Sequence, residues 1–208
     1  MNTHMIRVIA LMGMLLGACG AWAEGVGRVA RIQGTAEAQD GTVSRPLGAD
    51  AEIRAGDRLR TGAGSRLELH FSDGMQLTLS DGAEMVVDEF VWAPAAAQGK
   101  AALSLVSGSF LLQSGAVGKL PDHPLTVKTQ VASVGVRGTR FWGGPLGDPM
   151  NVLLLEGRIV VSNAAGSVDL DSPGAGTAIT APGTAPQPPS RWPDERVARA
   201  FATVSFGP

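Results

Sequence analysis

Apolar and polar residues alternate with a period of two along much of the chain. The segments RLELHF (66–71) and MQLTLS (75–80) show this alternation, and Ser-Asp-Gly marks the end of each. A period of two is typical of a strand with one buried face, and Asp-Gly favours a tight turn. This region predicts a β-hairpin followed by another turn.

Two longer segments, 101–114 and 151–166, place an apolar strand on each side of a central glycine, Gly108 or Gly157. Their likeness predicts two related β-arcs. The chain has 28 glycines and almost no helical periodicity before residue 190. The predicted fold class is therefore all-β, as a Gly-rich β-sandwich or a short β-solenoid-like domain.

The pattern changes near the end of the chain. Residues 182–192 are rich in proline and predict a linker, and residues 193–205 predict a short amphipathic helix. Val197, Ala200, Phe201 and Val204 share one face of this helix. So short a helix is marginal alone in water, so we expect it to dock on the β-domain and bury Phe201.

The start of the chain resembles an export signal. Arg7 precedes the apolar run 8–16, and small residues follow. Cleavage after Ala23 gives a soluble periplasmic protein, whereas a lipobox-like sequence ending at Cys19 gives a lipoprotein anchored there. We expect the soluble product, because strand-like alternation begins almost at once, at Val26. No run is long enough to predict a transmembrane segment.

These boundaries divide the chain into a signal peptide (1–23), a β-domain (24–181), the linker (182–192) and the helix (193–205). The 208 residues carry a formal net charge of -2, with basic residues scattered singly. Phosphate binding needs a basic patch, so nucleic acid is not an expected partner.

Candidate catalytic and metal-ligating residues are few. Cys19 is the only cysteine, which excludes disulfides and cysteine metal sites. His70 and His123 have no G-x-S-x-G nucleophile motif to serve, so we expect them to be structural or exposed. Asp73 and Asp81 of the Ser-Asp-Gly triplets are expected turn residues, because a calcium array would require a nonapeptide period. The sequence thus predicts no enzyme activity, cofactor or metal.

Three further acids, Glu84, Asp88 and Glu89, lie among strand-like residues. A solvated strand face explains them. The alternative is a carboxylate-based secreted hydrolase, which would require two acids with raised pKa values in one cleft.

The segment SVGVRGTRFWGG (133–144) combines a stiff strand with two arginines and two aromatic residues. Gly138 suits a turn, Thr139 can bond the local backbone, and Phe141 is an expected core residue. Arg137 either forms a partly buried ion pair, with Glu156 as its partner, or binds a carboxylate of another protein. Arg140 and Trp142 are two residues apart and, if both face outward, form a contact surface. The candidate contact or structural residues are Arg137, Gly138, Thr139, Arg140, Phe141 and Trp142.

This segment and its surroundings resemble the FecR-domain family, named for the periplasmic part of the iron-dicitrate regulator. The resemblance covers roughly residues 27–180. Regulator-type members place an anti-sigma segment and a membrane helix before this domain, and neither is seen here, so a stand-alone periplasmic member is implied. Many relatives have an acidic residue where this chain has Arg140. The motifs that match in order are Gly56-Asp57, Thr61-Gly62, the Ser-Asp-Gly turn, and Val136-Arg137-Gly138-Thr139 with Phe141.

Together these features predict a non-enzymatic, exported binding or scaffold module of the cell envelope, linked to signalling through its partner. The expected partner is an envelope protein or a glycan. The oligomeric state is left open by the sequence.

Overall fold

A computed structural model describes residues 25–122, 124–148 and 150–207. The expected signal peptide, both cleavage points, Cys19 and His123 lie outside the described residues. Within those ranges, no helix combines the length and hydropathy needed to cross a bilayer.

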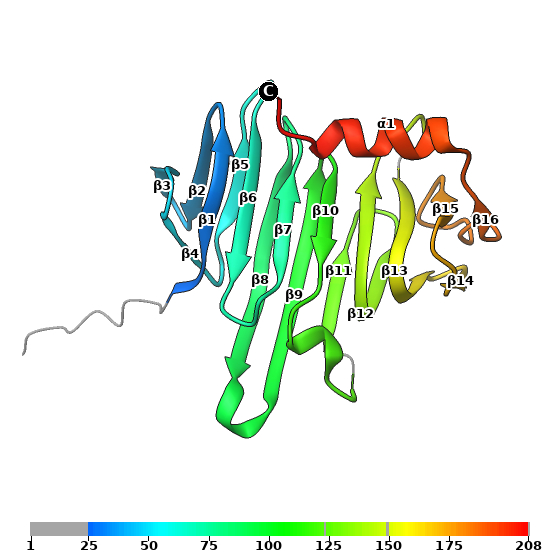
Figure 1. The fold of residues 1–208 in the computed structure, drawn as a ribbon, viewed down its shortest axis with the longest axis horizontal. Helices are drawn as coiled ribbons and strands as arrows, with labels where there is room; N and C mark the ends of the chain where they lie inside the picture. Colours follow the sequence, from blue (N-terminus) through cyan, green and yellow to red (C-terminus); the bar gives the residue numbers. More distant parts are fainter. Residues whose placement is uncertain (1–24, 123, 149, 208) are drawn as a thin grey trace, which may run out of the picture.

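The described residues form one sheet of 16 strands that curls into two layers (Figure 1). The two layers meet at one long strand, β12 (Ser133–Gly144). The first layer contains, in spatial order, β3 (Val43–Pro46), β2 (Ala36–Asp40), β5 (Arg58–Thr61), β8 (Glu84–Ala93), β9 (Gln98–Ser107) and β11 (Leu125–Lys128). The second contains β4 (Glu52–Arg54), β1 (Gly25–Gln33), β6 (Arg66–Phe71), β7 (Gln76–Leu79) and β10 (Phe110–Gln113).

Strand β12 joins the layers because its two halves have different neighbours. Residues 133–136 pair with β11, and residues 140–143 pair with β10. The other edge of β12 pairs along both halves with β13 (Met150–Asn163). Strand β13 in turn pairs with β14 (Gly166–Leu170) and β15 (Ala175–Ile179), and β15 pairs with β16 (Ser190–Arg191).

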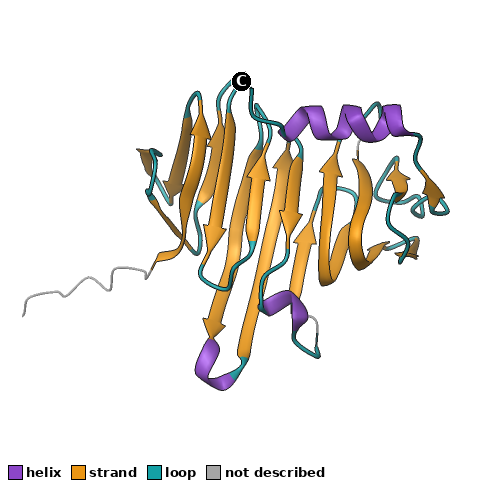
Figure 2. Ribbon diagram, viewed as in Figure 1, coloured by secondary structure: helices purple, strands orange, loops and turns teal. Residues whose placement is uncertain are grey.

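The core lies between the layers and holds the apolar residues of the alternating segments. Phe71 of the second layer stacks on Phe90 of the first, with ring centroids 5.1 Å apart. Leu67, Leu69 and Leu77 of the predicted hairpin are fully buried, and β6 and β7 pair as that hairpin. The all-β prediction is confirmed, with strands dominating the fold and one short C-terminal helix (Figure 2).

The two segments with central glycines differ from each other. Gly108, with φ of 81°, ends β9 and lets the chain cross to β10 in the other layer. Gly157 lies inside β13, which bends there but continues as one strand. The expected likeness holds for the strand–glycine–strand pattern but not for the connections it makes.

Buried hydroxyl groups connect the turns at one end of the layers. The Thr61 hydroxyl donates to the Ser80 carbonyl at 2.6 Å and accepts from the Ala83 amide at 2.9 Å. The Ser80 hydroxyl accepts from the Ser109 amide at 2.9 Å. A methyl group on Gly62 would lie 2.3 Å from Thr35 Oγ1. The Thr61-Gly62 motif therefore has a structural role.

Asp57 is the second structural acid of the motifs. It is 1% exposed, and its carboxylate accepts two hydrogen bonds from the Arg45 guanidinium and one from the Arg54 amide. The hydrogen bond with Asp57 raises the pKa of Arg45 above its ordinary value. Two bonds from one fork fix orientation as well as charge, so the pair ties β3 to the turn after β4.

The C-terminal helix α1 (Asp194–Val204) docks on the sheet, as expected, with Ala200 and Val204 buried. It lies across one end of the strands (Figure 1). The anchor differs from the expected one: Phe201 is only half-buried, and α1 packs instead against a cluster that includes Trp142, Leu153 and Trp192. The smaller Ala200 allows α1 to approach the indole rings closely.

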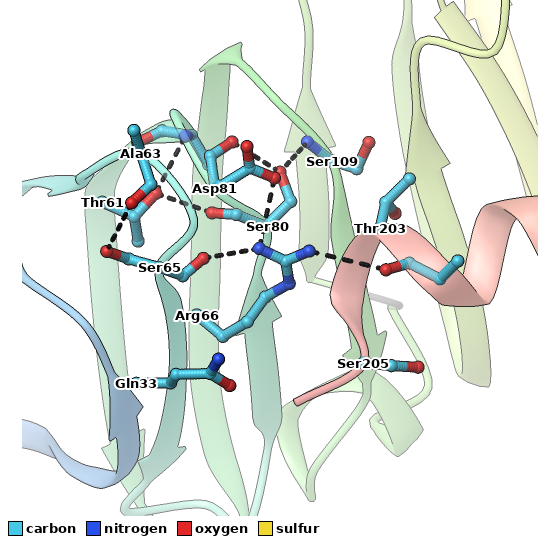
Figure 3. A network of polar contacts seen from close by, with 12 residues as sticks. Gln33, Thr61, Ala63, Ser65, Arg66, Ser80, Asp81, Ser109, Thr203 and Ser205 are labelled. Carbon is cyan, nitrogen blue, oxygen red and sulfur yellow. Dashed lines mark hydrogen bonds and ion pairs between the residues drawn. The ribbon is translucent and has the colours of Figure 1, made fainter. Parts of the chain in front are cut away.

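Polar contacts fix both ends of α1. The Arg196 guanidinium donates to Asn151 Oδ1 at 2.7 Å and lies over the Trp192 ring. At the other end, Arg66 reaches from β6 toward the last turn and donates to the Ala202 carbonyl at 3.5 Å (Figure 3). A cation at a helix C-terminus is favoured by the helix dipole.

The segment before the helix is also attached to the body. The Gln187 amide donates to the Ala178 carbonyl at 3.0 Å, and the Trp192 amide donates to the Gly174 carbonyl at 2.9 Å. Trp192 itself is 3% exposed. The proline-rich segment thus follows the surface of the sheet up to α1.

Candidate functional site

The signature segment forms a corner where β12 and β13 bend together. Gly138 has φ of 65° and Gly157 has φ of 80°, values that side chains with a Cβ rarely adopt. The register between the strands shifts between Arg137 and Phe141. A methyl group on Gly157 would lie 2.4 Å from the Gly138 carbonyl oxygen. The two glycines therefore allow two adjacent strands to bend in contact.

Three of the candidate residues point into the protein. Phe141 is fully buried and meets Phe110 edge to face, with centroids 5.5 Å apart, as a core residue should. Thr139 is 3% exposed, and its hydroxyl has no hydrogen-bond partner within the described structure, contrary to the expected backbone bond. Its amide instead donates to the Ser114 hydroxyl at 2.8 Å.

Trp142 corrects the expected contact surface. We expected it to face solvent beside Arg140, but it is fully buried beneath α1 and donates from Nε1 to the Thr203 hydroxyl at 3.0 Å. Its ring meets Trp192 edge to face. Trp142 does lie on the sheet face opposite Phe141, but the helix covers that face.

Arg137 is exposed, and the expected buried ion pair with Glu156 is wrong. Its neighbour across the strands is Arg158, and none of the hydrogen bonds or ion pairs between described residues involves the Arg137 side chain. Arg158 has a partner of its own, because Asp169 lies 3.1 Å away on β14. Like charges directly opposite each other on adjacent strands are unfavourable, so Arg137 is available to an external anion.

The register shift moves Glu156 opposite Arg140 instead. Arg140 is half-buried, and Lys119 lies close by, since a methyl group on Gly138 would be 3.6 Å from Lys119 Cγ. We call this group the arginine corner. Its members are Lys119, Arg137, Arg140, Glu156 and Arg158.

Other polar candidates serve the fold. His70 is exposed and lies 3.0 Å from a Glu68 carboxylate oxygen. Asp73 accepts hydrogen bonds from the Met75 and Val117 amides, and Asp81 forms an ion pair with Arg66. Among the described residues there is no cluster of three or more His, Cys, Asp or Glu able to hold a metal ion.

Glu84 is the acid with the most extensive ion pairing. Partial burial opposes its ionisation, but hydrogen bonds and charge attraction from Arg60 and Arg58 outweigh burial and lower its pKa. A general acid needs the opposite shift, a pKa raised toward neutrality. The pairing joins β8 to β5 and gives Glu84 a structural role.

The lowered pKa of Glu84 predicts a pH dependence of stability. The carboxylate stabilises the folded state fully above its ordinary pKa of 4.5, and this contribution is lost as the pH falls through the lower folded value. Thermal melts from pH 7 to pH 2 should therefore show a smaller acid-induced decrease in Tm for Glu84→Gln than for the parent protein. Equal decreases would contradict the prediction.

Sequence reasoning did not find Arg158 and Lys119. Arg158 directly follows Gly157, just as Arg137 directly precedes Gly138. Pairing the two glycines at the bend of an antiparallel hairpin would have placed the two arginines opposite each other. Nothing local indicates Lys119, which comes to the corner through the turn η2 (Val117–Lys119).

The fold and the corner define a class of protein: a curled, two-layer β-domain with structural signature residues and an exposed basic corner. The FecR protein family model matches residues 57–160, and the chain belongs to that family. The match begins at the buried Asp57 and ends just beyond the bend in β13. No curated protein matches the chain significantly.

Solved structures with a similar fold include two crystal structures of a proposed anti-sigma factor from Parabacteroides distasonis ATCC 8503. They superimpose with TM-scores of 0.53 and 0.52 at 16% sequence identity. Each alignment covers 68% of this chain and 62% of the solved chain. At this identity the likeness shows the fold alone.

Proposed function

We propose that the protein is a non-enzymatic binding module of the cell envelope that takes part in signalling by binding a carboxylate-bearing partner protein at the arginine corner. The observation that carries this proposal is the exposed guanidinium of Arg137, which faces Arg158 and has no partner among the described residues. Such a fork binds a carboxylate with two parallel hydrogen bonds.

Family membership supports the envelope and signalling parts of this proposal. FecR domains are periplasmic, and the similar solved structures belong to a proposed anti-sigma factor. The acids described above support a non-enzymatic role, since Asp57 and Glu84 are held in ion pairs that fasten strands. A scaffold for a glycan is a weaker proposal, because both faces of the Trp142 ring region are occupied by the chain itself.

The test removes the Arg137 charge without disturbing the fold. Arg137→Ala should change the free energy of unfolding by no more than about 0.5 kcal/mol, as for other exposed side chains. Arg137→Glu should abolish retention of the envelope protein that the parent captures from a native envelope extract. Raising the salt concentration should weaken capture by the parent, because the contact is electrostatic.

The matched control is Arg199→Ala, which removes an exposed arginine from α1. It should leave both stability and capture unchanged. A photo-cross-linker at position 137, but not at position 199, should join the captured partner covalently. If Arg137→Glu retains the partner fully, the arginine corner is not the binding site. If Arg137→Ala instead melts well below the parent, the residue is structural.

A further inference from the structure

The hairpin of β8 and β9 carries the longest exposed apolar stretch of the described chain. No charged residue occurs from Phe90 to Gly99, and residues 93–97, Ala-Pro-Ala-Ala-Ala, are all exposed. Val91, 53% exposed, is one of two exposed large aliphatic side chains among the described residues; the other is Val43. Figure 1 shows this tip reaching beyond the other strand ends, at the end of the molecule opposite α1.

The tip is firmly built. Trp92 is half-buried, and a methyl group on Gly99 would lie 3.0 Å from its ring and 2.7 Å from Val117. At the base, Lys100 and Glu89 form an ion pair with the two atoms 2.8 Å apart. The result is an uncharged protrusion on a charged base, with an indole between them.

A hollow of about 500 Å³ adjoins the tip, and none of the residues that line it is charged. Val91, Trp92 and Pro94 form one wall, and Gly25 and Val26 form another. Gly25 is where the described chain begins. The preceding segment, with its apolar run and Cys19, is therefore joined covalently to the protein beside the apolar tip.

We infer that this end of the molecule faces a lipid bilayer, with the β8–β9 tip resting in the interface and the chain anchored by acylated Cys19. Six residues separate Cys19 from Gly25, a reach of at most about 20 Å. An anchor that short holds the tip at the membrane surface. Tryptophan and apolar side chains beside a charged base suit the boundary between headgroups and acyl chains.

The anchor is part of the inference, because a short apolar tip binds membranes weakly alone and stable attachment requires two signals. Of the two cleavage options in the sequence, this arrangement favours the one at Cys19. It also places the arginine corner on a domain held at the membrane. The inference does not depend on the proposed function, because the tip and the corner share no residues.

The first test is mass spectrometry of the protein expressed with its full leader and recovered from envelopes. A diacylglyceryl group on Cys19 is expected. An unmodified N-terminus at Glu24 overturns the inference.

The second test measures contact with lipid. The chain from residue 19 onward carries one cysteine, so it can be coupled through Cys19 to maleimide lipids in phosphatidylethanolamine–phosphatidylglycerol vesicles. In a Trp22→Phe background, lipids brominated near the headgroups should quench Trp92 fluorescence. Trp142 and Trp192 are buried beneath α1, at the far end of the molecule, and should not be quenched.

Val91→Asp with Ala96→Asp should remove most of this quenching while leaving Tm unchanged. The matched control, Val43→Asp, places the same charge on the other exposed valine and should retain full quenching. Absence of quenching in the tethered parent overturns the inference. So does a tip variant that quenches normally, or one whose main effect is to dissociate an oligomer of the untethered protein, since the tip would then contact protein. None of these outcomes affects capture at Arg137.

Discussion

Trp142→Ala is expected to lower the free energy of unfolding by about 3–5 kcal/mol, the usual cost of emptying a fully buried aromatic site. In a domain of this size that corresponds to a decrease in Tm of about 6–20 °C. Trp142 is 0% exposed and joins the sheet to α1 through Trp192, Ala200 and Val204. The loss should therefore affect both the β-domain and the attachment of the helix.

Thr203→Ala separates packing from hydrogen bonding. It removes only the hydroxyl that accepts from Trp142 Nε1 and should cost about 1 kcal/mol. Calorimetric melts give Tm, and hydrogen exchange of the α1 amides shows whether the helix detaches. Free exchange in α1 with an unchanged Tm in Trp142→Ala would mean that the β-domain does not need the helix, contrary to this account.

Gly157→Ala should be the second large change, with a loss of about 2–6 kcal/mol. About 1–3 kcal/mol comes from the backbone conformation and about 1–3 kcal/mol from steric overlap. The added methyl group would meet the Gly138 carbonyl oxygen at 2.4 Å, and backbone atoms there cannot move aside without altering the bend of β12. Urea unfolding provides the measurement.

Gly74→Ala is the control for backbone strain. Gly74 has φ of 84°, close to the 80° of Gly157, but nothing lies within 4 Å of the added methyl group. Its cost should be limited to about 1–2 kcal/mol. Equal losses at the two positions would show that conformation alone, and not contact between the bent strands, sets the requirement for glycine at Gly157.

Local patterns were enough to predict the strands and the helix. The alternation of residues 66–71 predicts β6 with the same bounds, and the predicted helix 193–205 differs from α1 by one residue at each end. These predictions succeed because strand and helix periodicity reflect which side chains one element buries, a property of neighbouring residues. The signature motifs that indicated the FecR family are local for the same reason.

The sequence could not assign the two aromatic residues of the signature to their surroundings. Alternation places Phe141 and Trp142 on opposite faces of β12, and they are. Whether a face is covered depends on a distant segment, and α1 covers this one from more than 50 residues further along the chain. A pattern within one strand carries no information about that cover, so Trp142 was mistaken for a surface residue.

The partner of Arg137 was also decided only by tertiary structure. The sequence determined that an arginine, a flexible glycine and a second glycine-centred strand occur here. The bulge between Arg137 and Phe141 then set the register, placing Arg158 opposite Arg137 and Glu156 opposite Arg140. A one-residue shift exchanges an attractive neighbour for a repulsive one. Pairing between strands thus determined which charge is left exposed, and with it the candidate site.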